Sequence, residues 1–233
     1  MKIDIWSDIM CPFCYIGKRR LEAALEGFEH KDKVELVWHS FQLDPTIQSQ
    51  QGKNLYQYLA ERKGMPLERS KQMHDQLTQT AKEAGLTYNF DKAVIANSFD
   101  AHRLIQLAKK HGLGDAAEER LFKAYFTEGK DMSDHATLLQ LGTEIGLDDA
   151  EIKQMLESNA YADAVRSDIA TAEQLRINGV PFFVLDNKYG VSGAQPVELF
   201  SNALQQAWAE HTPAITSIGG GQDAVCGPDG CEI

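Results

Sequence analysis

The order of apolar and polar residues predicts a strand, a helix and a second strand at the start of the chain. Residues 2–7 alternate between two faces, as a strand does, and residues 12–28 place apolar side chains at helical spacing. Residues 34–41 are rich in β-branched and aromatic side chains and predict the second strand. A strand, a helix and a strand in this order indicate a parallel pair, and therefore an α/β fold.

After residue 45 the pattern becomes helical and later returns to strands. Between residues 46 and 177 the apolar positions recur every 3.6 residues, so we expect an all-helical segment. Its helices are expected to begin near Pro66, at a capping Ser98 and near Ser133, and to include residues 121–126 and 165–175. Residues 182–185 and 189–193 then predict a hairpin, and a last helix follows Pro196.

The net charge and the absence of long apolar stretches limit the partners of this protein. The 233 residues include 23 Lys and Arg against 34 Asp and Glu, and the formal charge of −11 repels nucleic-acid phosphates and anionic membranes. Residues 1–6 enter the strand pattern without the apolar core of a signal peptide, and no apolar stretch approaches the ~20 residues that cross a bilayer. We expect a cytoplasmic monomer or homodimer with no nucleic-acid or membrane partner.

The first cysteine pair has the pattern of a redox centre. Cys11 directly precedes the predicted helix, and Pro12 lies in the first turn, where its missing N–H costs nothing. The unpaired first-turn N–H groups, around Phe13 and Cys14, together with the helix dipole favour the Cys11 thiolate, which is the reactive form. Cys14 lies one turn further and can reach the Cys11 sulfur to displace a bound partner. The spacing therefore predicts Cys11 as the attacking cysteine and Cys14 as the resolving one.

A second motif supports the same chemistry from the far end of the chain. Val180-Pro181 precedes the third predicted strand, and thioredoxin-type sites place a cis-proline loop beside the cysteine pair. A cis bond there would leave the Val180 backbone free to pair with an extended substrate segment. We expect Pro181 to shape the site, and Pro12, Phe13 and Val180 to contact the substrate.

Several motifs together resemble the FrnE branch of the DsbA-like proteins. They are residues 11–18 (CPFCYIGK), 41–45 (FQLDP), 97–104 (NSFDAHRL), 125–129 (YFTEG) and 179–183 (GVPFF), within a similarity over about residues 2–210. The resemblance implies a thioredoxin-like fold (βαβ…ββα) with a large all-helical insertion. The thioredoxin-like domain would comprise residues 1–45 and 178–212, the insertion residues 46–177, and a flexible tail residues 213–233. Related 2-hydroxychromene-2-carboxylate isomerases and kappa-class glutathione transferases typically carry serine at the position of Cys11, so two cysteines favour dithiol exchange.

The second cysteine pair lies in the tail, after a Gly/Ser/Thr-rich stretch at residues 215–222. Cys226 and Cys231 enclose a Pro-Asp-Gly turn and can approach each other closely enough for a disulfide. Two interpretations stay open: an auxiliary dithiol that exchanges electrons with the first pair, and a pair without a required role. Four thiolates could also bind zinc, but the first pair begins a helix after a strand rather than forming a zinc knuckle, so we expect no metal.

Three further features have less specific interpretations. The resemblance suggests that His102 faces the site and contacts substrate, although a helical histidine beside apolar residues is more often a packed or hydrogen-bonded support. His39 is expected to be an ordinary strand-face residue, and residues 121–126 an apolar core stripe. Residues 18–20 (KRR) are expected to form a solvated basic face.

The preferred function is disulfide exchange with protein or small-molecule thiols, with no cofactor and with glutathione as the candidate co-substrate. A glutathione-dependent isomerase or transferase is the enzymatic alternative, in which Cys11 would stabilise a bound thiolate. A redox-switched binding protein or holdase is the non-enzymatic alternative. Loss of turnover in a Cys14→Ser variant would separate dithiol exchange from transferase activity.

Overall fold

The centre of the protein is a mixed β-sheet with the strand order β2-β1-β3-β4. The computed structural model describes residues 1–48 and 54–211, and near the C-terminus the backbone of two short strands, β5 (Cys226–Gly227) and β6 (Gly230–Cys231). The strands of the central sheet are β1 (Lys2–Ser7), β2 (Glu35–Ser40), β3 (Phe182–Leu185) and β4 (Tyr189–Ser192). β1 pairs with β2 in parallel and with β3 antiparallel, and β4 completes an antiparallel hairpin with β3.

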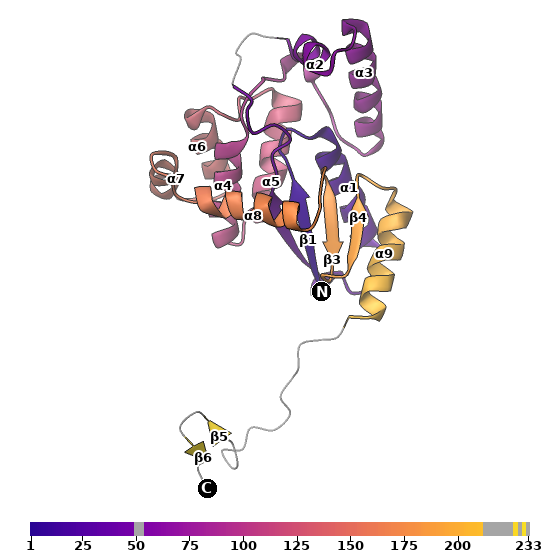
Figure 1. Ribbon diagram of the computed structural model, residues 1–233, viewed down its shortest axis with the longest axis vertical. Helices are drawn as coiled ribbons and strands as arrows, with labels where there is room; N and C mark the ends of the chain where they lie inside the picture. Colours follow the sequence, from indigo (N-terminus) through magenta and orange to yellow (C-terminus); the bar gives the residue numbers. More distant parts are fainter. Residues whose placement is uncertain (49–53, 212–225, 228–229, 232–233) are drawn as a thin grey trace.

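Helices cover both faces of this sheet (Figure 1). On one face, α1 (Pro12–Glu26) packs beside α9 (Val197–Ala209), and the core between them and the sheet includes Ile5, Phe183 and Phe200. On the other face, α8 (Ala162–Gln174) crosses the sheet. There, Trp6 packs against apolar residues that lie within α8 and directly after it. Successive residues of β1 thus point to opposite faces of the sheet, as the period of two predicts, and helices bury both faces.

A helical insertion separates β2 from β3. Its elements are α2 (Leu55–Lys63), α3 (Leu67–Glu83), η2 (Phe90–Lys92), α4 (Phe99–Lys110), α5 (Gly114–Lys123), the π-helical turn η3 (Ala124–Glu128), α6 (His135–Glu144), α7 (Asp149–Leu156) and α8, while the short η1 (Lys31–Lys33) precedes β2. The largest apolar core extends through the insertion and includes Cys11, Cys14 and Tyr15 of the first loop and helix. The insertion and the cysteine-bearing helix therefore share one core.

The structure confirms the α/β, thioredoxin-like architecture with a helical insertion and corrects details within it. The helices α2 and α7 are not predicted, because at 9 and 8 residues they are too short for a clear apolar period. Ser98 occupies the N-cap position of α4, but its side chain makes no capping bond. Instead, the side-chain oxygen of Asn97 accepts from the backbone N–H of Phe99 at 2.9 Å.

Three sequence-based expectations are not decided by the fold. The domain boundaries at residues 45 and 177 stay predictions. The glycine-rich stretch at residues 215–222 lies outside the described residues, and so do the side chains of Cys226 and Cys231, whose backbones pair across β5 and β6. Over residues 1–48 and 54–211, no helix combines the length and the apolar character needed to span a membrane.

Candidate functional site

Cys11 and Cys14 lie at the start of α1, at the end of the sheet where β1 leaves it. Cys11 is the N-cap residue with an extended backbone, and Pro12 is the first helical residue, as the sequence predicts. The two cysteines differ little in exposure, at 4% and 1%, but their neighbour Phe13 is 45% exposed. A partner that approaches the pair therefore meets the Phe13 ring first.

The Val180-Pro181 loop lies directly against the first cysteine. The Val180–Pro181 peptide bond is cis, and the Cys11 thiol donates to the Val180 carbonyl at 3.4 Å. Gly17, on the next turn of α1, allows this approach, because a Cβ there would lie 3.0 Å from Cγ of Pro181 and 3.1 Å from Phe183. Two segments that are far apart in the sequence thus form one site.

The surroundings of Cys14 keep this cysteine protonated. Complete burial raises the pKa of the Cys14 thiol well above its usual value, and the adjacent Cys11 sulfur raises it further. The backbone N–H of Asp8 and the Ser7 hydroxyl act on the Cys14 sulfur in the opposite direction and lower its pKa. A thiol in this state does not react with solvent reagents, which suits a group that reacts only with its neighbour.

The Asp8 carboxylate organises the loop that leads to the cysteines. Its two oxygens accept from the backbone N–H groups of Met10 at 3.2 Å and Leu43 at 2.8 Å. The Nε2 atom of His102 lies 3.4 Å from the same carboxylate, and the His102 side chain is 0% exposed. This burial corrects the expectation that His102 faces the substrate. Its position is that of an internal support for the Asp8 loop.

Comparison with known proteins identifies the family. Residues 2–205 match the DSBA-like thioredoxin domain family. The chain belongs to this family. A curated relative, the uncharacterized protein YwbO of Bacillus subtilis, is 30% identical over 207 residues, which cover 87% of this chain and 94% of YwbO.

Solved structures agree with this assignment. A probable DsbA oxidoreductase from Streptomyces coelicolor superposes with a TM-score of 0.86 at 42% identity, over 100% of this chain and 99% of that one. The glutathione-bound cytosolic disulfide reductase DsbM of Pseudomonas aeruginosa has a TM-score of 0.64 at 19% identity, over 90% of this chain and 100% of that one. A 2-hydroxychromene-2-carboxylate isomerase has a TM-score of 0.66 at 16% identity, over 90% and 97% of the two chains. The last two similarities show the shared fold.

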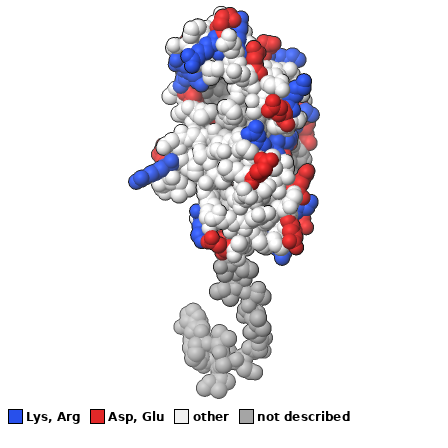
Figure 2. Space-filling model, turned by 90° about the vertical axis from the view of Figure 1, so that its right-hand side faces the viewer, with Lys and Arg blue, Asp and Glu red and all other residues white. Residues whose placement is uncertain are grey.

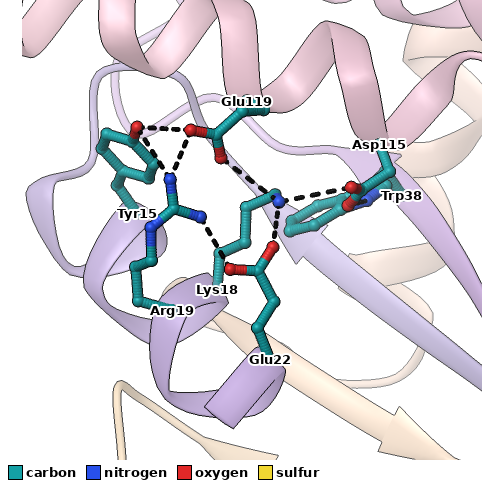
Figure 3. A network of polar contacts seen from close by, with 7 residues as sticks. All are labelled: Tyr15, Lys18, Arg19, Glu22, Trp38, Asp115 and Glu119. Atoms are coloured by element: carbon teal, nitrogen blue, oxygen red, sulfur yellow. Dashed lines mark hydrogen bonds and ion pairs between the residues drawn. The ribbon is translucent and has the colours of Figure 1, made fainter. Parts of the chain in front are cut away.

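In this DsbA-like protein the helical insertion holds the cysteine-bearing helix through a cluster of charges (Figure 3). The Lys18 ammonium, with a side chain only 3% exposed, forms ion pairs with Glu22 of its own helix and with Asp115 and Glu119 of α5. Arg19 adds contacts to Glu22 and Glu119. The expected solvated basic face is therefore wrong for Lys18, because α5 supplies carboxylates that the helical period of α1 cannot reveal.

Two further residues, Tyr15 and Trp38, add hydrogen bonds to this cluster of charges. The Tyr15 hydroxyl donates to Glu119 at 2.7 Å, and the Tyr15 ring stacks on Phe122 with centroids 4.9 Å apart. The indole N–H of Trp38 donates to Asp115 at 3.0 Å, so β2 joins α1 and α5 in this cluster. The helix that carries the dithiol is thus fixed to the insertion along two turns.

The structure also shows polar residues that are not among the predicted site residues. Ser7 and Asp8 directly precede the cysteine motif, and their position in the sequence is the signal that could have drawn attention to them. Tyr88 of the insertion donates from its hydroxyl to the Pro12 carbonyl at 2.6 Å, and no sequence signal connects the two. His39 lies on its strand face, as expected, between Asp4 at 2.7 Å and Asp168 at 2.8 Å.

Zinc binding is the alternative use of the cysteines. Among the described side chains, no group of three or more His, Cys, Asp or Glu is arranged to hold a metal ion. The zinc alternative also requires Cys226 and Cys231, whose side chains lie outside the described part of the chain. The sulfurs of Cys11 and Cys14 are packed in an apolar core.

Proposed function

We propose that the protein is a thiol–disulfide oxidoreductase in which Cys11 attacks and Cys14 resolves. The observation that carries this proposal is the contact between the Cys11 thiol and the Val180 carbonyl at 3.4 Å. This contact lies beside Pro181, and the buried Cys14 follows in the first turn of α1. A sulfur at a helix N-terminus is stabilised as a thiolate by the first-turn N–H groups and by the dipole. Membership of the DsbA-like family supports the same reaction class.

The exchange transfers two electrons from the dithiol to a substrate disulfide. The Cys11 thiolate forms a bond to one substrate sulfur, the substrate S–S bond breaks, and one substrate thiolate leaves and takes up a proton. Cys14 then loses its proton and attacks Cys11, which forms the Cys11–Cys14 disulfide and releases the second substrate thiol. The same steps in reverse oxidise substrate thiols, so the reduction potential decides the direction.

The remaining site residues have roles in binding the substrate. Phe13 presents an exposed ring beside Cys11, and Pro12 is half-buried next to it. The Val180 backbone, next to Pro181, is suited to pair with an extended segment on either side of the substrate cysteine.

The face shown in Figure 2 intersperses acidic and basic side chains, so it offers no extended charge of one sign for a polyanion.

Glutathione is the proposed co-substrate that restores the dithiol. Two glutathione thiols would reduce the Cys11–Cys14 disulfide and leave as oxidised glutathione, and the glutathione in the DsbM structure makes this tripeptide the first compound to test. We propose the tail pair, Cys226 and Cys231, as an auxiliary dithiol for the same step. A cytoplasmic location is proposed with it, since only a reducing compartment supplies glutathione thiols in excess.

Cysteine variants test the proposed function. Cys14→Ser should accumulate a mixed disulfide between Cys11 and a substrate thiol, which mass spectrometry detects, and should lose turnover in insulin reduction. Cys11→Ser should lose both the mixed disulfide and the turnover. Glutathione transfer or isomerisation that survives in Cys14→Ser would instead support the isomerase or transferase. A wild-type protein that reduces no disulfide and oxidises no dithiol would overturn the proposed function, and glutathione transfer or isomerisation would then separate the isomerase or transferase from the redox-switched binding protein.

A further inference from the structure

Tyr88 of the insertion makes a direct hydrogen bond to the cysteine motif. It lies between α3 and η2, its side chain is 5% exposed, and its hydroxyl donates to the Pro12 carbonyl oxygen at 2.6 Å. Pro12 is the residue between Cys11 and Phe13, so this bond reaches the peptide group at the centre of the redox turn. Among the described residues, no other side chain donates a hydrogen bond to that carbonyl.

The insertion holds Tyr88 rigidly in place. The Tyr88 ring stacks on Phe126 with centroids 4.6 Å apart and meets Phe90 edge-on at 5.4 Å. The backbone on either side is bonded to the π-helical turn η3: Asn89 N–H donates to the Phe126 carbonyl at 2.7 Å, and the Thr127 hydroxyl donates to the Thr87 carbonyl at 2.7 Å. A hydroxyl presented on such a platform has little freedom to leave its acceptor.

The phenol also interacts electrostatically with both sulfurs. Burial raises the pKa of Tyr88, and negative charge on Cys11 and then on Cys14 raises it further, so the hydroxyl remains a neutral donor when a thiolate forms. A donor bound to a carbonyl polarises the whole peptide group and strengthens the N–H at its other end. Here that N–H belongs to Phe13, one of the first-turn amides without a partner inside the helix.

We propose that Tyr88 is a positioning residue of the dithiol, through which the helical insertion sets the thiolate stability of Cys11 and the redox equilibrium of the pair. The effect on exchange with glutathione rests on the proposed function. The effect of the hydrogen bond to Pro12 on the Cys11 thiolate does not require any turnover. Tyr88 acts through the Pro12–Phe13 peptide group and does not need to touch the substrate.

The chain provides a matched control for the test. Tyr56 of α2 also lies in the insertion, and its hydroxyl donates to Asp91 at 3.1 Å on the surface. Tyr88→Phe and Tyr56→Phe remove the same hydroxyl group and leave a ring of the same shape. Thr127→Val is a second route to the same effect, because it loosens the platform without changing the Tyr88 ring.

Two measurements follow Cys11 in these variants. The first is the pH profile of iodoacetamide alkylation of Cys11, in a background with Cys14 replaced by serine and Cys226 and Cys231 by alanine. The second is the equilibrium of the intact dithiol with glutathione redox buffers. For Tyr88→Phe we expect about threefold less Cys11 thiolate at a given pH, and an equilibrium about threefold closer to the disulfide, which is about 14 mV more negative. Thr127→Val should shift both in the same direction, and Tyr56→Phe should shift neither.

The outcomes separate this inference from the function on which it rests. If Tyr88→Phe and Thr127→Val give wild-type profiles and wild-type equilibria while their melting temperatures fall, Tyr88 is a packing residue and the inference is overturned. The same holds if Tyr56→Phe shifts the two measurements as strongly as Tyr88→Phe. If the wild-type dithiol does not equilibrate with glutathione at all, the proposed exchange with glutathione fails, and the alkylation profile still decides the role of Tyr88.

Discussion

Glu118 of α5 is a buried carboxyl group whose neutralisation should stabilise the protein. The side chain is 1% exposed, and its Oε2 atom has no hydrogen-bond partner. Burial raises the pKa of Glu118 from the ordinary 4.5 to about 8, and the Asp115 carboxylate raises it as well, while Lys18 opposes the shift. We choose Glu118→Gln as the perturbation, because the amide matches the protonated carboxyl in shape and carries no charge.

The magnitude follows from the two pKa values. In the unfolded chain Glu118 is ionised above about pH 4.5, whereas the folded protein holds it protonated up to about pH 8. Folding at pH 7 must therefore return a proton to this group, which costs about 1.4 kcal/mol for each pH unit above 4.5, or about 3 kcal/mol. The stability that the wild type has below pH 4.5 is lost as the pH rises towards 8.

The assay is urea denaturation of the wild type and Glu118→Gln, followed by tryptophan fluorescence at a series of pH values. We expect the variant to exceed the wild type by about 3 kcal/mol at pH 7, by more than about 4 kcal/mol near pH 9, and by less than about 0.5 kcal/mol at pH 4.5. The comparison cancels the other titrating groups, which both proteins share. A difference that stays constant between pH 5 and pH 8 would refute the reasoning.

The adjacent residue provides a control of opposite sign. Partial burial would raise the pKa of Glu119, but hydrogen bonds from Arg19 and Tyr15 outweigh it and lower the pKa overall. A carboxylate with a lowered pKa stabilises the folded state above its ordinary pKa, and this contribution is lost as the pH falls. Glu119→Gln should therefore destabilise the protein at pH 7, where Glu118→Gln stabilises it.

Two further predictions concern the loop beside Cys11 and the charges on the opposite face of the sheet. Gly17→Ala places a Cβ 3.0 Å from Pro181 and 3.1 Å from Phe183, so the loop must shift, and we expect a fall in the rate of mixed-disulfide formation. The urea midpoint should change little, because the gain of about 1 kcal/mol in helix propensity offsets the strain. An unchanged rate would show that the loop position is not critical. Burial alone would raise the pKa of Asp168, but hydrogen bonds from His39 and a backbone N–H lower it overall. The Asp168 carboxylate therefore stabilises the folded protein at neutral pH, and this contribution is lost in acid. Asp168→Asn should remove it. Urea curves at pH 7 and pH 3 check this, since the gap between the two proteins must narrow at the lower pH.

The sequence predicts the parts of the site that depend on local order. The strand before Cys11, the proline in the first turn of α1 and the Val180-Pro181 loop are all readable from residue types at short spacing. The order of strands and helices also predicts the parallel pair of β1 with β2 and the hairpin of β3 with β4. These features need no knowledge of which distant segments meet.

The contacts between the insertion and α1 could not be predicted from the sequence. Lys18 lies in a run of three basic residues that looks solvent-exposed until α5 places Asp115 and Glu119 beside it. Tyr88 appears as one more aromatic residue of a core, and Glu118 as one more acid of a polar helix. In each case the environment of the residue depends on a side chain or backbone group from a separate element. Only the tertiary fold brings the two elements together.

The position of the insertion between β2 and β3 has a consequence for the order of folding. β1 and β2 are close in sequence and can pair early, but Ile5 meets Phe183 only after the whole insertion has been bridged. Bringing the ends of such a long segment together carries an entropic cost before any contact is gained, and non-local pairings of this kind form slowly. The Cys11 sulfur should therefore be present on a native-like helix before the Val180-Pro181 loop arrives, so a partly folded chain would expose a thiol that has no selectivity for its partners.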